Sequence, residues 1–298
     1  MHAQPTYLMT DAAQYDVAYQ INPWMKPDAW SARPEANRQA AALGSKALRI
    51  ALEDSGGVVR TIGGVAGLPD MVFPANAAVV LDGKALVARF RHAERRGEEP
   101  HFLKAFEDLK AQGLLTEVVQ IESAFQEGAG DCIWDATRGL FWVGSGPRSS
   151  PESAKIIADH FGQKVVHLPL ASDRFYHLDT CFCPLAGGDI LYYPSALTEE
   201  ALARLKEIVP AELLIEATDE DAAAFCVNAV CLDKTVIMAM PGFPLRERLG
   251  ALGYQVLGID LSPFILSGGA AYCMTLRLDL TSAVAEASAP VQARALAG

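Results

Sequence analysis

The chain has 298 residues, with 25 Lys and Arg against 36 Asp and Glu, which gives a formal net charge of −11. This charge argues against a nucleic-acid-binding protein, because contacts to phosphates need an excess of basic side chains. Hydrophobic residues make up 51% of the chain and no apolar run approaches the roughly 18 residues that cross a bilayer, so we expect a globular protein without a membrane partner. Asp11 and Asp16 stand where a signal peptide has basic and apolar stretches, which predicts a cytoplasmic protein.

In chain order, the first predicted strand is Tyr7-Leu8-Met9, and an amphipathic helix at 37–55 and a strand at 58–62 follow it. From residue 76 onward a polar residue repeatedly opens an apolar strand, which turns and returns as a second strand. These hairpins are predicted at 76–90, 131–144, 179–193 and 228–240, and a fifth opens at 273–278. A helix and a short strand follow each of the first four, at 98–113 and 115–121, 150–161 and 165–170, 198–209 and 212–216, and 243–252 and 254–259.

The opening residues of the hairpins recur at similar spacing, which indicates an internal repeat. They are Asn76, Asp131, Asp179, Asn228 and Cys273. Five hairpin-plus-helix units account for nearly the whole chain, and the strand at 7–9 would complete the fifth hairpin and close a ring. We therefore predict an α/β fold, a fivefold pseudosymmetric α/β propeller forming a single domain over residues 1–281, with an Ala-rich tail over 282–298 that frays. An ordinary α/β sheet with regular units is the alternative.

In a propeller the five opening residues would point at one axis, and a polar cluster inside an apolar ring needs a reason. Cys273 is in register with the polar openers and follows Ser267-Gly-Gly-Ala-Ala271, which we expect to be a flexible loop that a ligand can approach closely. A thiol becomes a nucleophile when a neighbouring cation or histidine favours its thiolate. We expect the other five cysteines to be mostly buried free thiols.

His177 precedes Asp179 by two residues, and on a strand two such residues share a face. The pair is suited to a general acid/base that is oriented by a carboxylate. Glu127 and Asp131 flank the glycines of Glu-Gly-Ala-Gly-Asp, a pattern that brings backbone and acids to a ligand, although a hairpin turn that only satisfies local amides is the simpler interpretation.

A series of short motifs, in this order and spacing, resembles the guanidine-modifying superfamily, the penteins, over roughly residues 5–280. The superfamily includes arginine deiminases, dimethylarginine dimethylaminohydrolases, arginine dihydrolases and glycine amidinotransferase. The matching motifs are Ile21-Asn22-Pro23-Trp24-Met25, Leu68-Pro69-Asp70 with Phe73 and Asn76, Phe90-Arg91-His92 with Gly97-Glu98-Glu99, Glu127-Gly128 with Gly130-Asp131, His177-Leu178-Asp179, and Gly268-Gly269 before Cys273.

The resemblance implies a fivefold α/β propeller in which Cys273 attacks the guanidinium carbon and His177 is the acid/base. It also implies that Glu127 holds the guanidinium, with Asp179 and either Asp70 or Asn76 completing the grip. The motif at Glu127 is one residue longer than in arginine deiminases, which leaves Asp131 as an alternative to Glu127.

Two further features of the resemblance concern the substrate. Arg91 and Arg148 resemble the arginines that lie near the substrate carboxylate in the superfamily, and a surface salt bridge is the simpler interpretation of each. Arginine deiminases carry an acid where this chain has Asn76, and Asn22 and Asn76 together are more similar to the bacterial arginine dihydrolases. The general layout also fits the dimethylarginine hydrolases.

The sequence thus predicts a cysteine-dependent hydrolase that acts on the guanidino group of arginine or a substituted arginine and needs neither a metal nor an organic cofactor. The expected partner is a small cationic guanidino compound, and a homodimer is left open. One alternative is an amidinotransferase that uses the same cysteine and histidine. Another is a non-catalytic binding protein of the pentein fold, which we would expect to lack both residues.

Overall fold

The predicted hairpins and the strands that follow them form five sheets in the computed structural model, which describes residues 4–283. In each sheet the central strand pairs antiparallel with one neighbour and parallel with the other. The sheets are β15 (Leu276–Arg277), β1 (Thr6–Thr10) and β2 (Val58–Ile62); β3 (Ala78–Leu81), β4 (Lys84–Val87) and β5 (Glu117–Gln120); β6 (Cys132–Asp135), β7 (Leu140–Ser145) and β8 (Lys164–Pro169); β9 (Phe182–Pro184), β10 (Ile190–Tyr192) and β11 (Leu214–Glu216); and β12 (Val230–Leu232), β13 (Thr235–Ala239) and β14 (Gln255–Ile259).

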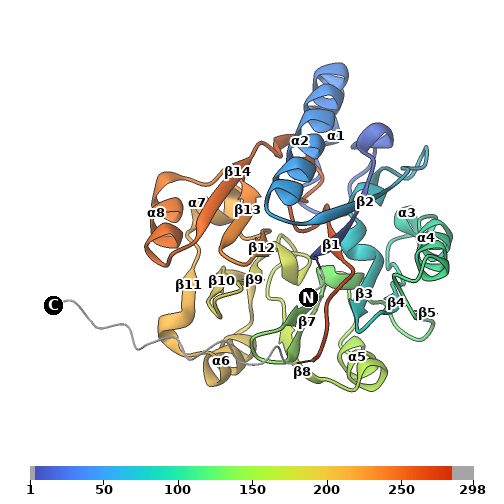
Figure 1. Ribbon diagram of the computed structural model, residues 1–298. Helices are drawn as coiled ribbons and strands as arrows, with labels where there is room; N and C mark the ends of the chain where they lie inside the picture. The colour runs from blue at the N-terminus through green and yellow to red at the C-terminus, as the bar shows by residue number, and fades with distance from the viewer. Residues whose placement is uncertain (1–3, 284–298) are drawn as a thin grey trace.

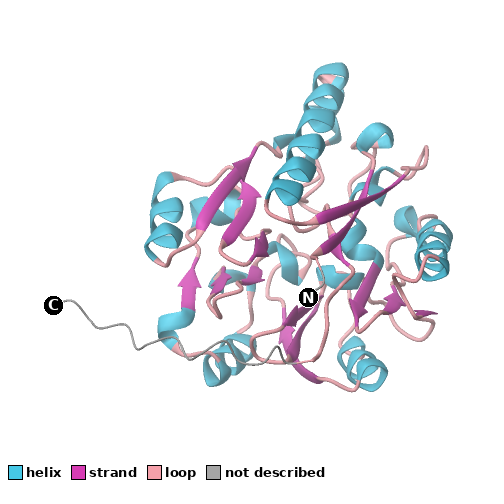
Figure 2. Ribbon diagram, in the orientation of Figure 1, coloured by secondary structure: helices cyan, strands magenta, loops and turns pink. Residues whose placement is uncertain are grey.

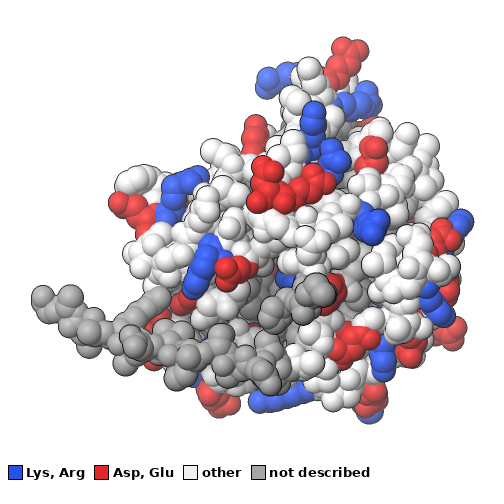
Figure 3. Space-filling model, in the orientation of Figure 1, with Lys and Arg blue, Asp and Glu red and all other residues white. Residues whose placement is uncertain are grey.

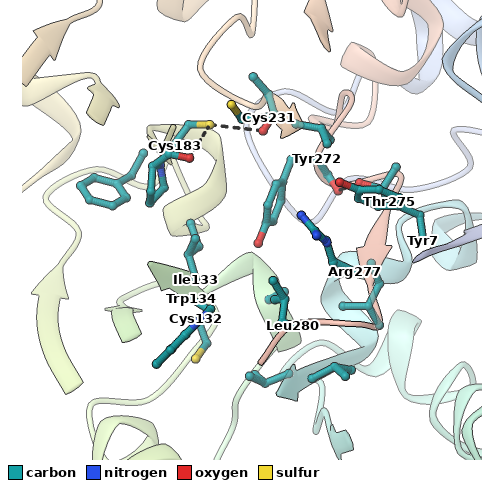
Figure 4. Close-up of a pocket in the computed structure, with 18 of the residues that line it drawn as sticks. Tyr7, Cys132, Ile133, Trp134, Cys183, Cys231, Tyr272, Thr275, Arg277 and Leu280 are labelled. Atoms are coloured by element: carbon teal, nitrogen blue, oxygen red, sulfur yellow. Dashed lines mark hydrogen bonds between the residues drawn. The ribbon is translucent and has the colours of Figure 1, made fainter. Parts of the chain in front are cut away.

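The five sheets surround a common centre (Figure 1). A cavity of about 110 Å³ lies there, and its lining includes residues of β3, β6, β9, β12 and β15, one strand from each sheet. Figure 4 shows side chains from these separate strands around it. The first strand of every hairpin therefore faces the central axis, and the predicted fivefold α/β arrangement is confirmed.

The longer helices lie outside the sheets, as Figure 2 shows. They bury one apolar face each, as Phe102, Phe106 and Leu109 do in the helix at 99–111. The helices are α1 (Pro27–Ser31), α2 (Pro34–Asp54), α3 (Ala93–Arg96), α4 (Glu99–Ala111), α5 (Ser153–Phe161), α6 (Glu199–Ile208), α7 (Asp219–Ala223), α8 (Phe243–Ala251) and α9 (Ser262–Ile265).

The ends of the chain close the ring as predicted. Strand β1 near the N-terminus pairs with β15, with Tyr7 opposite Arg277 and Leu8 opposite Leu276.

The hairpin between β3 and β4 turns at Asp82 and Gly83, which both have positive φ angles, as a two-residue turn of this twist requires.

The opening residues do not begin the strands, which corrects the sequence interpretation. Asn76 lies within a 3₁₀ turn over Pro74–Ala77, Asp131 directly follows one over Gly128–Gly130, and Asp179 lies within one over Leu178–Thr180. The expectation that His177 and Asp179 share one face of a strand is therefore wrong. Each tight turn leads into the strand and presents its polar side chain at the end of the axis.

Hydrogen bonds from the backbone and hydroxyl of Ser282 to Asp82 tie down the start of the predicted tail, and residues from 284 onward lie outside the described part of the chain. The division into a domain and a tail stays a prediction.

Among residues 4–283 no helix is both long and apolar enough to span a membrane. Acidic and basic side chains are interspersed over the visible face in Figure 3, so the negative net charge forms no single acidic surface there.

Candidate active site

Seven polar residues from five separate turns gather at one end of the axis, and each is between 0% and 3% exposed. They are Asn76, Glu127, Asp131, His177, Asp179, Asn228 and Cys273. None of them lines the 110 Å³ cavity, although Cys132 and Tyr272, which do, are their direct neighbours in the chain. Because burying polar groups is costly unless they are paired, the contacts within this cluster determine what it can do.

His177 is held between an acid and an amide. Its Nε2 lies 2.8 Å from Oε2 of Glu127 and 3.9 Å from Oδ2 of Asp131, and Nδ2 of Asn76 lies 3.3 Å from its Nδ1. Arg95 donates to Oδ1 of Asn76 over 2.8 Å, and because a guanidinium has no acceptor, the amide must turn its NH₂ group toward the imidazole. Nδ1 of a neutral His177 therefore accepts, and the proton on Nε2 faces Glu127.

Two glycines allow this close packing. Gly128 has a φ of +62°, and a Cβ there would collide with the backbone of Ala75 and Asn76. A Cβ on Gly130 would collide with the amide of Asn76 and press on the ring of His177. The glycines between Glu127 and Asp131 therefore allow the turn to approach the imidazole. The simpler interpretation, a hairpin turn that only satisfies local amides, does not account for this packing.

Glu127 is ionised in this setting. Burial by itself raises the pKa of the Glu127 carboxyl, but the guanidinium of Arg148, 3.0 Å away, and the bonded imidazole lower it by more, so that its pKa lies well below the usual value. Asp131 is held differently, since its two oxygens accept from the backbone of Leu178 and the hydroxyl of Ser149, and burial raises its pKa. Glu127 is therefore the acid that directly pairs with the histidine.

Cys273 contacts Asp179 on the other side of the cluster. Its Sγ lies 3.1 Å from Oδ2 of that carboxylate. Burial raises the pKa of Asp179 to about 7, and burial together with the neighbouring Asp179 charge raises the pKa of the thiol well above its ordinary value. With no ligand bound, Cys273 is a thiol that donates its proton to Asp179.

The loop before Cys273 is packed, contrary to the expected flexibility. Ala270 and Ala271 are fully buried, and a Cβ on Gly269 would collide with the ring of Phe73. Tyr176, next to His177, donates its hydroxyl proton to the carbonyl of Gly268. The loop therefore holds the thiol in a fixed place.

Two carboxylate oxygens in this region have no hydrogen-bond partner among the described residues. They are Oδ1 of Asp179 and Oδ1 of Asp70, both buried. The other oxygen of Asp70 accepts from the hydroxyl of Tyr19, and burial raises the pKa of that carboxyl. Buried acceptors without donors are suited to a ligand that brings its own N–H groups.

Two predicted substrate-binding residues have their side chains occupied by backbone groups. The amide of Asn22 donates to the carbonyl of Ser267 and accepts from the backbone of Trp24 and Met25. The guanidinium of Arg91 donates to the carbonyl of Arg148, while its backbone N–H donates to Glu127. Both residues lie beside the cluster, and their contact with substrate stays a prediction.

Sequence reasoning missed Arg95, which is buried against Asn76 and forms a two-pronged ion pair with Glu98. It stands in a run of charged residues, a pattern typical of a solvated surface. Asn228 was likewise not predicted as a site residue. It is one of the five openers, and its position in the repeat was the available signal. Its amide lies 3.1 Å from Sγ of Cys273.

We expect Asp179→Asn to make the thiol more reactive while slowing turnover. Removing the carboxylate removes a charge that raises the pKa of Cys273, so alkylation of this thiol by iodoacetamide should begin at lower pH and be faster at neutral pH. Turnover should fall because the acceptor for a bound cation is weakened. Peptide mass analysis of the alkylated protein across pH measures this, and an unchanged pH dependence would contradict the assigned Asp179–Cys273 contact.

Within residues 4–283, no three or more His, Cys, Asp or Glu side chains are arranged to hold a metal ion. The cluster contains the components of nucleophilic catalysis: a thiol, an imidazole paired with an ionised acid, and an unpartnered carboxylate oxygen of Asp179 beside the thiol.

Comparison with known proteins identifies relatives that share nearly the whole described fold. A family model for N,N dimethylarginine dimethylhydrolase, eukaryotic, matches residues 9–280. The chain is 38% identical over 271 residues to the bifunctional arginine dihydrolase/ornithine cyclodeaminase ArgZ of Synechocystis sp., a match that covers 91% of this chain and 37% of ArgZ. It is 34% identical over 272 residues to the N(G),N(G)-dimethylarginine dimethylaminohydrolase of Mycobacterium tuberculosis, covering 91% of this chain and 85% of that protein.

Crystal structures of the N-terminal domain of ArgZ, one bound to substrate and one covalently bound to a reaction intermediate, align with a TM-score of 0.86. Each is 37% identical and covers 93% of this chain and 99% of the crystallised domain. The chain thus corresponds to slightly more than a third of the full length of ArgZ, at its N-terminal domain.

Proposed function

This chain belongs to the N,N dimethylarginine dimethylhydrolase family, and from that membership and the geometry of its buried cluster we propose that it is a cysteine-dependent hydrolase of guanidino groups. The substrate is arginine or a substituted arginine, and the reaction passes through a covalent thiouronium on Cys273. Relatives that act on arginine or on dimethylarginine, and the covalent intermediate of the ArgZ domain, support this chemistry.

The unpartnered oxygen of Asp179 is the observation that carries the proposal. Its second oxygen already bonds to Sγ of Cys273, so a ligand N–H that donates to Oδ1 would lie next to the sulfur. A guanidinium is planar, permanently charged and has five N–H donors, which suits a carboxylate in this position. The bound cation would also favour the thiolate, so the substrate helps to activate its own nucleophile.

The reaction then has two stages. The proton of the Cys273 thiol passes to His177 as Sγ forms a bond to the guanidino carbon, a C–N bond breaks, and His177 passes that proton to the leaving amine. Water attacks the resulting thiouronium and gives a proton to His177, and the C–S bond breaks to release the ureido product and the thiol. Glu127, rather than Asp131, stabilises the imidazolium, because it lies 2.8 Å from Nε2 and is ionised.

Arg148 is the residue that we propose to bind the carboxylate end of the substrate. Its guanidinium donates to Glu127 and to the carbonyl of Ile21 and lies over the ring of Tyr176, while its buried Nε has no partner within the described residues. A buried cation with an unused donor is suited to a carboxylate. Arg91, bonded to the backbone of Arg148, would fix its position.

Incubating the protein with arginine, methylated arginines, agmatine and guanidino acids, and identifying the products by mass, tests the proposal. We expect release of ammonia or a methylated amine from arginine or a methylated arginine. Transfer of the amidino group to an added amine would identify an amidinotransferase instead. Tight binding of these compounds without any product would identify a binding protein, and either result would overturn the proposal.

We expect Asn76 to determine how far the reaction proceeds with arginine. A neutral amide can donate to the oxygen of a ureido group, which a carboxylate would repel, so the wild type should accept citrulline again and release ornithine and two molecules of ammonia. Asn76→Asp should shift the products toward citrulline, which amino-acid analysis measures.

Asn37→Asp is the matched control, since it makes the same change at an amide that donates to the backbone of Trp30 on the other side of the α1–α2 turn. It should leave the product ratio unchanged. A wild type that stops at citrulline, with the same product in Asn76→Asp, would show that this interpretation of Asn76 is wrong.

A further inference from the structure

Asn228 is fully buried, and both functional groups of its amide are used. Oδ1 accepts from the backbone N–H groups of Ala270 and Cys273 over 3.1 and 3.2 Å. Nδ2 donates to the carbonyl of Asp179 over 3.0 Å and to Sγ of Cys273 over 3.1 Å. One side chain therefore contacts the nucleophile, its loop and the turn of the neighbouring acid.

The orientation of this amide is determined by its partners. Backbone N–H groups can only donate, so the two from Ala270 and Cys273 require the oxygen of Asn228 on their side. The NH₂ group must then face the sulfur and the carbonyl of Asp179.

The turn that carries Asn228 is strained, which indicates that its geometry is specified. Phe225 has a φ of +61°, a region that side chains of this size seldom adopt, and its carbonyl accepts from the backbone N–H of Asn228. Its ring is fully buried and packs edge-on against Trp24 with centroids 4.8 Å apart. Strain of this kind persists only where the surrounding packing enforces it, and it is frequent beside active sites.

We propose that Asn228 is a further catalytic residue, whose Nδ2–H stabilises the thiolate of Cys273 while its Oδ1 fixes the loop that carries the thiol. The inference rests on the proposed function only in naming Cys273 as the nucleophile. A thiol sulfur is a weak acceptor and a thiolate a strong one, so the N–H···S bond strengthens as the proton leaves.

Asn228 and the neighbouring acid, Asp179, thereby shift the pKa of the Cys273 thiol in opposite directions. Burial and the carboxylate of Asp179 raise the pKa of the thiol, whereas the N–H groups of Ala270 and Asn228 lower it. The guanidinium of a bound substrate can neutralise Asp179, but it leaves when the product does. The amide of Asn228 is a permanent donor, present in the free enzyme and throughout the reaction.

Alkylation of Cys273 by iodoacetamide in the absence of substrate tests the inference, with rates taken from the mass of the peptide that contains Cys273. Two variants are compared. Asn228→Ala removes the donor and the loop anchor without adding charge, and Asn228→Asp removes the donor while its carboxylate can still accept from Ala270 and Cys273. The loss of the N–H donor to sulfur is the change that both share.

We expect the pH dependence of alkylation to move to higher pH in both variants, with the rate at neutral pH falling about 10- to 100-fold, the scale of a hydrogen bond to a charged group. Asn37→Asp should leave the profile unchanged. Thermal unfolding of each variant establishes that the folded protein is being measured. Because the carboxylate added in Asn228→Asp would itself raise the pKa of the thiol, the shift in Asn228→Ala is the supporting result. If Asn228→Ala does not fold, an unchanged profile in Asn228→Asp would still overturn the inference.

A rate that falls equally at every pH, or an unchanged profile in a folded variant, would overturn the inference, because either result would restrict Asn228 to positioning the loop. The readout needs no turnover. A wild type that hydrolyses no guanidino compound but shows the shift would contradict the proposed function while leaving the inference standing.

Discussion

The Cys273→Ser variant is expected to fold and bind substrate but to lose turnover, by a factor on the order of 10⁶, the scale seen when a covalent nucleophile is removed from a hydrolase. A serine hydroxyl fits the space of the thiol and can donate to Asp179 as the thiol does. It cannot replace the thiol in the reaction, because an alcohol is a far weaker nucleophile than a thiol at neutral pH.

Steady-state assays with the preferred guanidino substrate, together with its binding affinity measured by calorimetry, test this expectation. Cys231→Ser is the matched control, since that thiol is partly exposed on β12 and lies outside the cluster. It should retain full activity. Activity in Cys273→Ser comparable to that of the wild type would contradict the assignment of the nucleophile.

The His177→Ala variant is expected to bind substrate and to turn it over about 10²- to 10⁴-fold more slowly, the usual effect of removing a general acid/base. His177 is fully buried between Glu127 and Asn76, so no other imidazole can take its place. Because water needs a base to attack the thiouronium, the covalent intermediate should accumulate in this variant and be visible by intact mass.

His101→Ala is the control for this variant, because His101 is exposed at the start of α4. Its kinetics should match those of the wild type. The pH–rate profile provides a second readout, because His177→Ala removes the group that we propose to move the protons and should change the profile. A profile identical to that of the wild type would show that another group moves the protons.

The repeat predicted the fold well because each unit has local signals that do not depend on its neighbours. The hairpin predicted at 76–90 and the helix predicted at 198–209 both appear in the structure, the first turning at Asp82 and Gly83 and the second capped by the hydroxyl of Thr198. The helix predicted from Ser150 begins only at Ser153, where no side chain caps its first turn. Boundaries of this kind depend on tertiary packing, which the local pattern does not contain.

The candidate site was predictable as a set of residues but not as a set of pairs. The five openers meet at the axis because the units are related by rotation, and spacing reveals this. The partner of His177 was predicted to be Asp179, which follows it closely in sequence, but in the structure it is Glu127, 50 residues away on another unit. Asn228 pairs with Cys273 across 45 residues in the same manner. Such pairings follow from the three-dimensional ring and leave no local signature.

The most direct test of the proposed covalent mechanism is to quench the wild-type protein during turnover of arginine or a methylated arginine and to locate any covalent adduct by peptide mass analysis. We expect an amidino group, derived from the guanidino carbon, to be attached to Cys273 during turnover and to be absent once the substrate is consumed. An adduct on any of the other five cysteines, or turnover by His177→Ala under the same conditions without any adduct, would contradict it.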